Sequence, residues 1–318
     1  MSIIEKAAGK LKQVEKDVKA AASPSIIEKA SDKAEIKERP RVSQAQNNIS
    51  TEFERGPEIG LSESTTGINP TRLHGATSQS NVAMIDLDRL RQLGVVNPID
   101  EKSQIGEEFR IIKRPLITNA FNQNSGRTNN GNLIMITSAF VGEGKTFCAI
   151  NLAMSIAMEM DHTVMLVDAD VARPSVPNYL GIESEKGLMD VLLDKNLDLS
   201  DVMMRTNVEK LSIVTSGRKS RHATELLASQ NMSDLLTEIA QRYNDRIVIF
   251  DSPPLLMTSE ARVLASQMGQ IVLVVEAEKT SQKAVKDALR QIESCESINL
   301  IYNKARPFGG GDLYGYYY

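Results

Sequence analysis

The sequence predicts an α/β fold in which a mostly parallel sheet is covered by helices on both faces. Three observations predict it: six short apolar stretches beyond residue 130, helical stretches between most of them, and a glycine-rich loop after the first. Near-continuous apolar strands suit a sheet buried on both faces, and parallel neighbours need helical crossovers. The strands are expected at 132–137, 163–168, 211–215, 246–251, 271–276 and 299–303.

Helices are expected on either side of these strands. Four lie among or after them, at 145–160, 223–243, 258–268 and 280–294. Two precede the first strand, "IDLDRLRQLGVVNP" (85–98) and "SQIGEEFRIIKRPL" (103–116). Each of these two is expected to close at its proline, which cannot continue a helix without losing a hydrogen bond.

Composition narrows the class of protein. The 318 residues are 41% apolar and 25% charged, with a net charge of −4, which gives no electrostatic case for nucleic acid as a partner. Cys148 and Cys295 match no metal spacing and suit a reducing compartment. The longest apolar runs, such as "IVLVV" (271–275), fall far short of the ~20 residues of a membrane helix. A cytoplasmic protein is expected.

Residues 1–83 are expected to be an extension outside the folded domain. "SIIEKA" occurs at 2–7 and again at 25–30, and each copy opens with the Ser-x-x-Glu pattern of a capping box. Two short amphipathic helices are expected there, which would dock on a partner or, less readily, on a membrane surface; chance composition is the alternative. The polar, turn-rich stretch 43–71 is expected to be a disordered linker.

The strongest local signal is "TSAFVGEGKTFCAINLA" (137–153), which follows a strand and opens a helix. Glycines let backbone N–H groups surround phosphate oxygens, and the helix N-terminus adds partial positive charge. Lys145 would hold the β- and γ-phosphates, and the Thr146 hydroxyl would face Mg²⁺. The first glycine of the usual pattern is replaced by Ala139. The expected nucleotide-binding residues of this loop are Val141, Gly142, Glu143, Gly144, Lys145, Thr146 and Phe147.

Three carboxylates follow two of the strands. Asp168 and Asp170 end "VMLVDAD", and Asp251 ends "IVIFD". Ligands bind at the carboxyl edge of open α/β sheets, so these acids are expected beside the phosphate loop. Mg²⁺ prefers a few carboxylates together with phosphate oxygens and water. A metal site formed by Thr146 and the three acids is therefore expected, and ATP and Mg²⁺ are the expected cofactors.

The chain closes with "GGGDLYGYYY" (309–318), which holds four of its seven tyrosines. A stretch behind three glycines is too flexible to be a core element. It is either an adhesive disordered end or a substrate. The expected division is thus 1–83, a domain at 84–308, and a flexible tail at 309–318.

Taken in order, "AFVGEGKT", "VMLVDADVARP", "IVIFDSPP" and "YGYYY" resemble the motifs of the bacterial tyrosine kinase (BY-kinase) family of exopolysaccharide systems. The resemblance covers roughly residues 84–318 and implies the deviant P-loop ATPase fold that partition ATPases share. "SIIEKA" and "IDLDRLRQLG" resemble the subset linked to exosortase and PEP-CTERM loci. Two segments depart from the family pattern. In the first, the position that is usually arginine is Ala172, and the arginine follows it as Arg173. The second, "SGRKSRHATELLAS" (216–229), is basic and lacks the usual Asn-Pro.

The resemblance implies roles for individual residues. Lys145, Asp168, Asp170 and Asp251 would be catalytic, with Asp168 or Asp170 accepting the phenol proton. Asn303 would approach the adenine base. The tail residues that would be autophosphorylated in trans are Tyr314, Tyr316, Tyr317 and Tyr318.

The resemblance also implies partners. A Glu-x-x-Arg-x-x-Arg motif that forms a ring of subunits is matched by Glu107 and Arg110, with Lys113 in its last place. Phosphorylation would switch this ring between assembled and dissociated forms. The other partners would be a separate transmembrane chain-length regulator, which recruits the protein to the inner membrane face, and a cognate tyrosine phosphatase. The activity would regulate exopolysaccharide synthesis, polymerisation or export.

A rival function exists on the same fold. Partition- and septum-positioning ATPases use ATP as a switch and phosphorylate no protein. They carry a second lysine early in the loop, where this chain has Phe140, and no terminal tyrosine cluster. Both differences favour the kinase.

Overall fold

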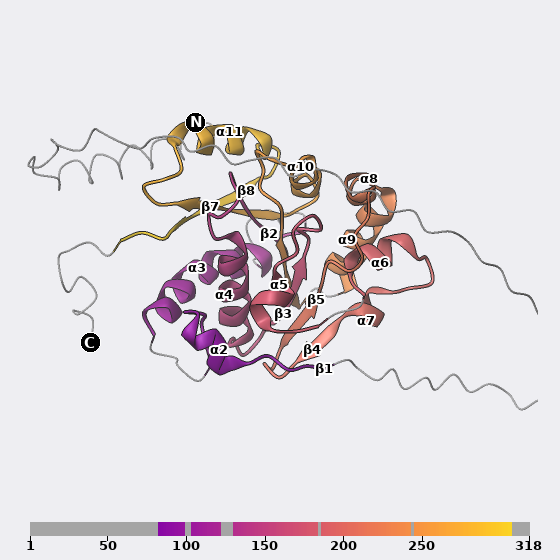
Figure 1. Ribbon diagram of the computed structural model, residues 1–318, viewed down its shortest axis with the longest axis horizontal. Helices are drawn as coiled ribbons and strands as arrows, with labels where there is room; N and C mark the ends of the chain where they lie inside the picture. The colour runs from indigo at the N-terminus through magenta and orange to yellow at the C-terminus, as the bar shows by residue number, and fades with distance from the viewer. Residues whose placement is uncertain (1–81, 99–102, 122–129, 184–185, 243–244, 307–318) are drawn as a thin grey trace, which may run out of the picture. The chain divides into compact units, whose positions relative to one another are not determined.

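The computed structural model describes residues 82–98, 103–121, 130–183, 186–242 and 245–306, which form a layered α/β fold (Figure 1). Within them an eight-stranded sheet has the order β1-β4-β5-β3-β6-β2-β7-β8. Neighbouring strands are parallel except for the pair β4 and β5. The strands are β1 (Val82–Ala83), β2 (Leu133–Ser138), β3 (Thr163–Asp168), β4 (Met204–Thr206), β5 (Leu211–Val214), β6 (Arg246–Asp251), β7 (Gln270–Glu276) and β8 (Ser297–Asn303).

Helices cover both faces of this sheet. One face carries α2 (Leu87–Gln92), α3 (Gln104–Phe121), α4 (Lys145–Ala157) and α5 (Val176–Leu180). The other carries α6 (Leu188–Leu193), α7 (Leu199–Val202), α8 (Ala223–Leu227), α9 (Gln230–Arg242), α10 (Ser259–Ala265) and α11 (Gln282–Gln291). Successive residues of a strand point to opposite faces, so Ile134 joins the α4 side and Met135 the α9 side. This confirms the expected parallel sheet covered on both faces.

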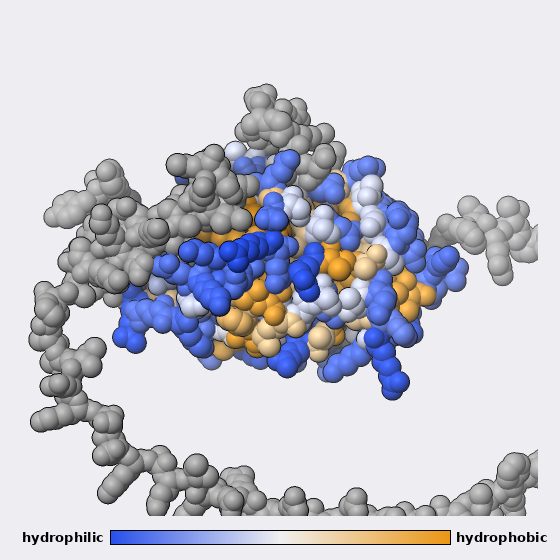
Figure 2. All heavy atoms as spheres, turned by 90° about the horizontal axis from the view of Figure 1, so that it is seen from above, coloured by the Kyte–Doolittle hydropathy of each residue, from blue (hydrophilic) through white to orange (hydrophobic). Residues whose placement is uncertain are grey.

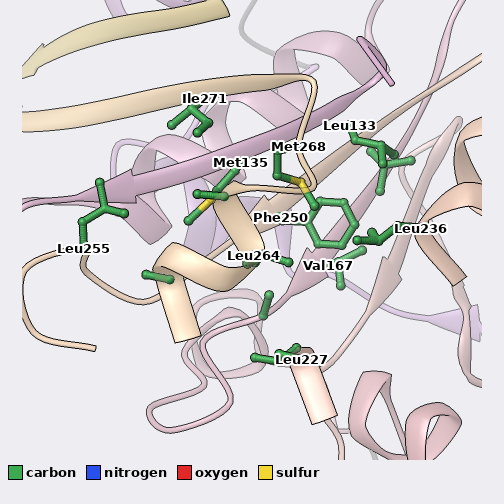
Figure 3. Close-up of a cluster of buried hydrophobic side chains, with 14 of the residues drawn as sticks. Leu133, Met135, Val167, Leu227, Leu236, Phe250, Leu255, Leu264, Met268 and Ile271 are labelled. Carbon is green, nitrogen blue, oxygen red and sulfur yellow. The ribbon is translucent and has the colours of Figure 1, made fainter. Parts of the chain in front are cut away.

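The core on the α9 side centres on Phe250 of β6, which is fully buried. Figure 3 shows its ring among Leu133 of β2, Leu236 of α9 and Met268, which follows α10. Burying an aromatic ring of this size removes a large apolar area from water. The packing fixes β6 at the centre of the sheet, and with it the position of Asp251 at the strand end.

The six expected strands are all present within two residues of their predicted bounds, and the structure adds elements that the sequence did not predict. These are β1, β4, α5, α6 and α7, and none of them exceeds six residues. Such short elements carry too little periodicity to be read from sequence. The single helix expected at 223–243 is wrong: α8 ends at Leu227, and Ser229, whose Oγ accepts from Met232 N at 3.3 Å, opens α9.

The predicted end of the helix expected at 103–116 is also wrong. Helix α3 runs through Pro115 to Phe121, although proline removes one backbone hydrogen bond. The second half is held by tertiary contacts. Leu116 is buried and its carbonyl accepts from Gln270 Nε2 at 2.9 Å, while the Phe121 ring stacks on His162 at 4.3 Å between centroids. These contacts outweigh the local cost of the proline.

Much of the surface on the face seen in Figure 2 is hydrophilic, with apolar residues between the charged ones. Among the described residues, the exposed large apolar side chains include Phe140, Val141 and Met257. Across that part of the chain, helices are either too short or too polar to cross a bilayer.

Lys113 lies inside the subunit, between α3 and α4. Its side chain is 6% exposed, and its Nζ donates to the Ser155 carbonyl at 2.6 Å and pairs with Glu159 Oε1 at 2.7 Å. Glu107 and Arg110 are partly exposed and pair with each other. Lysine at this place of the expected oligomerisation motif thus binds the end of α4, where carbonyl groups lack helical partners. A ring contact through Glu107 and Arg110 stays a prediction.

Lys113→Met is expected to lower the free energy of unfolding by roughly 1–3 kcal/mol, because a buried carbonyl loses its donor and Glu159 its partner. Urea denaturation measures the change. The matched control, Lys283→Met, removes an exposed lysine of α11 and should change stability by less than about 0.5 kcal/mol. Equal stabilities for the two variants would contradict the prediction.

Candidate active site

The phosphate loop joins β2 to α4 at the carboxyl edge of the sheet. Gly142 and Gly144 adopt φ values of 89° and 97°, in the left-handed region that other residues avoid. Gly144 is the N-cap of α4, so the first backbone N–H groups of the helix lack intrahelical partners. A phosphate group would satisfy them, as expected for this motif.

The Glu143 side chain and side chains from two other segments hold the loop in place. The buried carboxylate of Glu143 accepts from Phe140 N at 2.8 Å and from the Thr280 hydroxyl. Asn303 Nδ2 donates to the Glu143 carbonyl at 2.8 Å, and Lys304 Nζ donates to the Gly142 carbonyl at 2.7 Å. These contacts clamp the backbone of the loop.

Two members of this clamp were not predicted. Thr280 lies in the turn after β7, and Lys304 directly follows β8. Their position after strand ends is the signal that could have found them, since parallel strands bring such residues to one edge. Asn303, expected near the base, lines the adjoining cavity with its amide turned toward the loop.

The acids and Lys145 meet below the loop. Lys145 Nζ lies 2.7 Å from Asp170 Oδ2 and 3.8 Å from Asp251 Oδ1. Thr146 Oγ1 donates to Asp251 Oδ2 at 2.6 Å. Asp168 accepts from Ser175 N and Val176 N, both at 3.0 Å. The structure thus brings together the lysine, the threonine and the three carboxylates expected from the motifs.

Burial and like charge shift the pKa values of this cluster. Desolvation first, and the Asp251 charge second, raise the pKa of Asp168 to about 7. Desolvation also raises the pKa of Asp251 to about 6, against the opposing effect of Lys145 and Thr146. For Lys145, burial alone lowers the pKa, but Asp251 and Asp170 outweigh it and the pKa is raised. The carboxylates are crowded and favour a neighbouring cation.

The residues present fit a magnesium ion that shares its ligands with phosphate. Asp251 Oδ1 is buried without a hydrogen-bond partner, which leaves an acceptor for a cation beside the Thr146 hydroxyl. Within the described ranges, no group of three or more His, Cys, Asp or Glu residues could hold a metal ion by itself. Mg²⁺ normally keeps only one or two carboxylates beside phosphates and water, so this donor set suits it.

A cavity of about 750 Å³ opens beside the cluster. Its lining includes the loop residues Gly142 to Phe147 except Glu143, together with Asp170 and Arg173 from the segment after β3, Met257 and Thr258 from the segment after β6, and Asn303 and Lys304. A volume of this size is typical of sites for nucleotide-sized ligands. Among the residues expected to bind the nucleotide, Glu143 lies behind the lining and acts through the loop backbone.

Without nucleotide or divalent cation, the free energy of unfolding is expected to fall as the pH rises from about 5 to about 8. The unfolded chain releases the protons of Asp168 and Asp251 near pH 3.8, whereas the folded protein holds them until about 7 and about 6. The folded state therefore binds more protons in this interval, and deprotonation costs stability. Asp190 and Glu276, whose pKa values are lowered, act below this window.

Urea denaturation at about pH 5 and about pH 8, in the presence of a chelator, measures this change of the free energy of unfolding with pH. Asp251→Asn removes one titrating group and the repulsion on Asp168, so it should flatten the slope. A free energy of unfolding that is the same or higher at the upper pH would contradict the raised pKa values of Asp168 and Asp251.

Comparisons with known proteins agree with this site. The AAA domain family model AAA_31 matches residues 131–303. The chain is 32% identical over 228 residues to the tyrosine-protein kinase YwqD of Bacillus subtilis (strain 168), covering 71% of this chain and 92% of that protein. It is also 32% identical over 186 residues to the tyrosine-protein kinase CpsD of Streptococcus agalactiae, covering 57% of this chain and 78% of that one.

A solved structure gives the same result. The kinase domain of the Escherichia coli tyrosine kinase ETK superposes with a TM-score of 0.59 at 29% identity, covering 71% of this chain and 85% of that chain. These relatives favour the kinase over the partition-type ATPase that the fold also allows. With its phosphate loop, acid cluster and sheet order, this chain belongs to the family of bacterial tyrosine-protein kinases.

Proposed function

We propose that this protein is an ATP:protein-tyrosine phosphotransferase that phosphorylates the tyrosine cluster 314–318 of a second copy. The observation that carries the proposal is the position of Lys145, whose ammonium group lies between Asp170 and Asp251 at the wall of the nucleotide cavity. A phosphate-binding cation beside a buried base is what transfer to a phenol requires. The tail itself lies outside the described residues.

The reaction would break the bond between the γ-phosphorus and its bridging oxygen and form a bond to the tyrosine oxygen. The phenol proton has to leave, since tyrosine has a pKa of about 10. Asp170 is the better candidate for the base, because it lines the cavity whereas Asp168 is fully buried and bonded to the backbone. Lys145 would pass from Asp170 to the incoming phosphates and so free that carboxylate to accept the proton.

Mg²⁺, held by Thr146 and Asp251, would supply charge neutralisation on the phosphate oxygens. The loop amides would stabilise the equatorial oxygens of the transferred group, and the clamp of Glu143, Asn303 and Lys304 would keep those amides aligned. Asn303 would also approach the adenine base from the cavity wall.

Incubation with Mg²⁺ and ATP, followed by mass spectrometry of the peptide 307–318, tests this function. Phosphate is expected on Tyr314, Tyr316, Tyr317 or Tyr318. ATP hydrolysis with an unmodified peptide would overturn the kinase and leave a nucleotide switch.

Transfer in trans has its own test. The full-length Lys145→Met chain has the acceptor tyrosines but no phosphate-binding lysine. A chain with all four tail tyrosines changed to phenylalanine has the lysine but no acceptor in its tail. Mixed, they should yield phosphate on the Lys145→Met chain, at a rate that rises with total protein concentration. An unmodified Lys145→Met chain in this mixture, beside a modified wild type, would show that transfer is confined to one copy.

We further propose that the activity regulates exopolysaccharide synthesis, polymerisation or export. The protein would assemble as a ring, dock on a separate membrane-spanning chain-length regulator at the inner face of the membrane, and be reset by a tyrosine phosphatase. Family membership supports this context. Co-purification with such a regulator that survives deletion of residues 1–80 would exclude the N-terminal extension as the essential contact.

A further inference from the structure

A strongly basic loop lies at residues 217–222, after β5, and the proposed transfer reaction does not use it. Arg218, Lys219 and Arg221 are exposed within five positions. Arg218 pairs with Asp190, but within the described residues no ion pair or hydrogen bond engages the side chain of Lys219 or Arg221. Two cationic groups on this loop thus have no side-chain partner in the part of the chain that the structure describes.

The topology puts the basic loop at the edge of the sheet that holds the acid cluster. Strand β5 is the neighbour of β3, and Val214 pairs with Val167, one residue before Asp168. On its other side the loop leads into α8, where Thr224 Oγ1 donates to Glu260 of α10 at 2.7 Å. Helix α10 directly follows Thr258, which lines the nucleotide cavity.

Figure 1 shows α6, α8 and α10 close together at this end of the molecule. Arg173, which is exposed, lines the cavity from the segment after β3. Cationic groups thus occupy two neighbouring loops of the same edge.

The start of the basic loop is anchored to Asp190 of α6. The buried carboxylate of Asp190 accepts from Gly187 N at 2.9 Å, from Arg218 N at 3.1 Å and from Arg218 Nε at 2.5 Å. Gly217 has a φ of 75°, and a Cβ there would lie 2.1 Å from Asp190 Oδ2. An anchored loop loses little conformational entropy when it binds a ligand, which favours affinity.

The proposed product has the charge that fits this loop. Asp312 is the only charged side chain in residues 307–318, and each phosphate on a tail tyrosine adds about −1.5 to −2 charges. The cluster of Asp168, Asp170 and Asp251 repels such a group, whereas the cations of the basic loop attract it. On the basis of the proposed function, we propose that the basic loop binds the phosphorylated tail of a second copy after the first transfer.

Capture at the sheet edge that also carries the acid cluster keeps the next tyrosine near that cluster. Tyr314 and Tyr318 are four residues apart, about 13 Å in an extended chain. Arg218 is neutralised by Asp190, so Lys219 and Arg221 supply two positive charges, which balance about one phosphotyrosine. The basic loop therefore retains a partly phosphorylated tail, and further phosphates exceed its charge and favour release.

Synthetic peptides test this binding without turnover. Peptide 307–318 is prepared unphosphorylated and with one phosphate on Tyr316, and each is titrated at low salt into the full-length four-phenylalanine chain by fluorescence anisotropy. The phosphopeptide is expected to bind about tenfold more tightly, as one or two charge-assisted hydrogen bonds would give. Lys219→Ser/Arg221→Ser should remove the difference, and Lys195→Ser/Lys283→Ser, with the same loss of charge, should retain it.

Two kinds of result would overturn the proposal. One is equal binding of the two peptides, or equal discrimination by the loop variant and its control. The other is a loop-dependent interaction with phosphatidylserine vesicles in place of the phosphopeptide, which would assign the loop to a membrane surface. Because no ATP is added, failure here leaves the kinase proposal standing, and failure of tail phosphorylation leaves this binding measurable.

Discussion

Lys145→Met is expected to reduce phosphorylation of the tail by about two to three orders of magnitude, the usual effect of removing one charge-stabilising donor. The methionine side chain has a similar length and no charge, so the change removes the ammonium group that lies between Asp170 and Asp251. Label from γ-³²P-ATP on the full-length chain measures the loss.

Lys283→Met is the matched control, because it makes the same chemical change on the exposed side of α11. It should retain full activity. A Lys145→Met chain that keeps a tenth or more of the wild-type label would contradict the phosphate-binding role. Circular dichroism of both variants separates loss of chemistry from loss of fold.

Changing Tyr314, Tyr316, Tyr317 and Tyr318 together to phenylalanine is expected to abolish labelling of the chain while ATP binding is unchanged. Phenylalanine keeps the ring and removes only the hydroxyl that accepts the phosphoryl group. The cavity residues are untouched, so a fluorescent ATP analogue should bind with the same affinity.

The tyrosines that the structure does describe, Tyr179 and Tyr302, serve as the control. Changing Tyr179 and Tyr302 to phenylalanine should leave the label at its wild-type level, although Tyr179 lines the cavity. Full labelling of the four-phenylalanine chain would move the acceptor to another residue and end the assignment of the tail.

The sequence predicted the central strands because burial on both faces requires apolar residues at every position, and such runs are conspicuous. It predicted the loop, Lys145 and the acids because a phosphate site needs these residue types at fixed spacing. It did not predict the Glu143 to Thr280 contact, since two residues 137 positions apart are brought together only by the strand order.

Pro115 and Lys113 show the limits of local rules. Proline opposes a helix, yet packing of Leu116 and Phe121 extends α3 past it. A lysine in a charged motif suggests a surface contact, yet Lys113 points into the subunit toward Ser155. In both places contacts with distant segments decide, and a single sequence does not show which segments meet.

The bond from Lys304 to the Gly142 carbonyl holds the end of the described chain beside the phosphate loop. Tyr318 is twelve residues after Arg306, so the contour length between them is about 40 Å. Any assembly that transfers phosphate between copies must place the mouth of one cavity within that span of the next copy's Arg306. In an assembly where that distance is larger, the tail of one copy cannot reach the cavity of another, however tightly the copies associate.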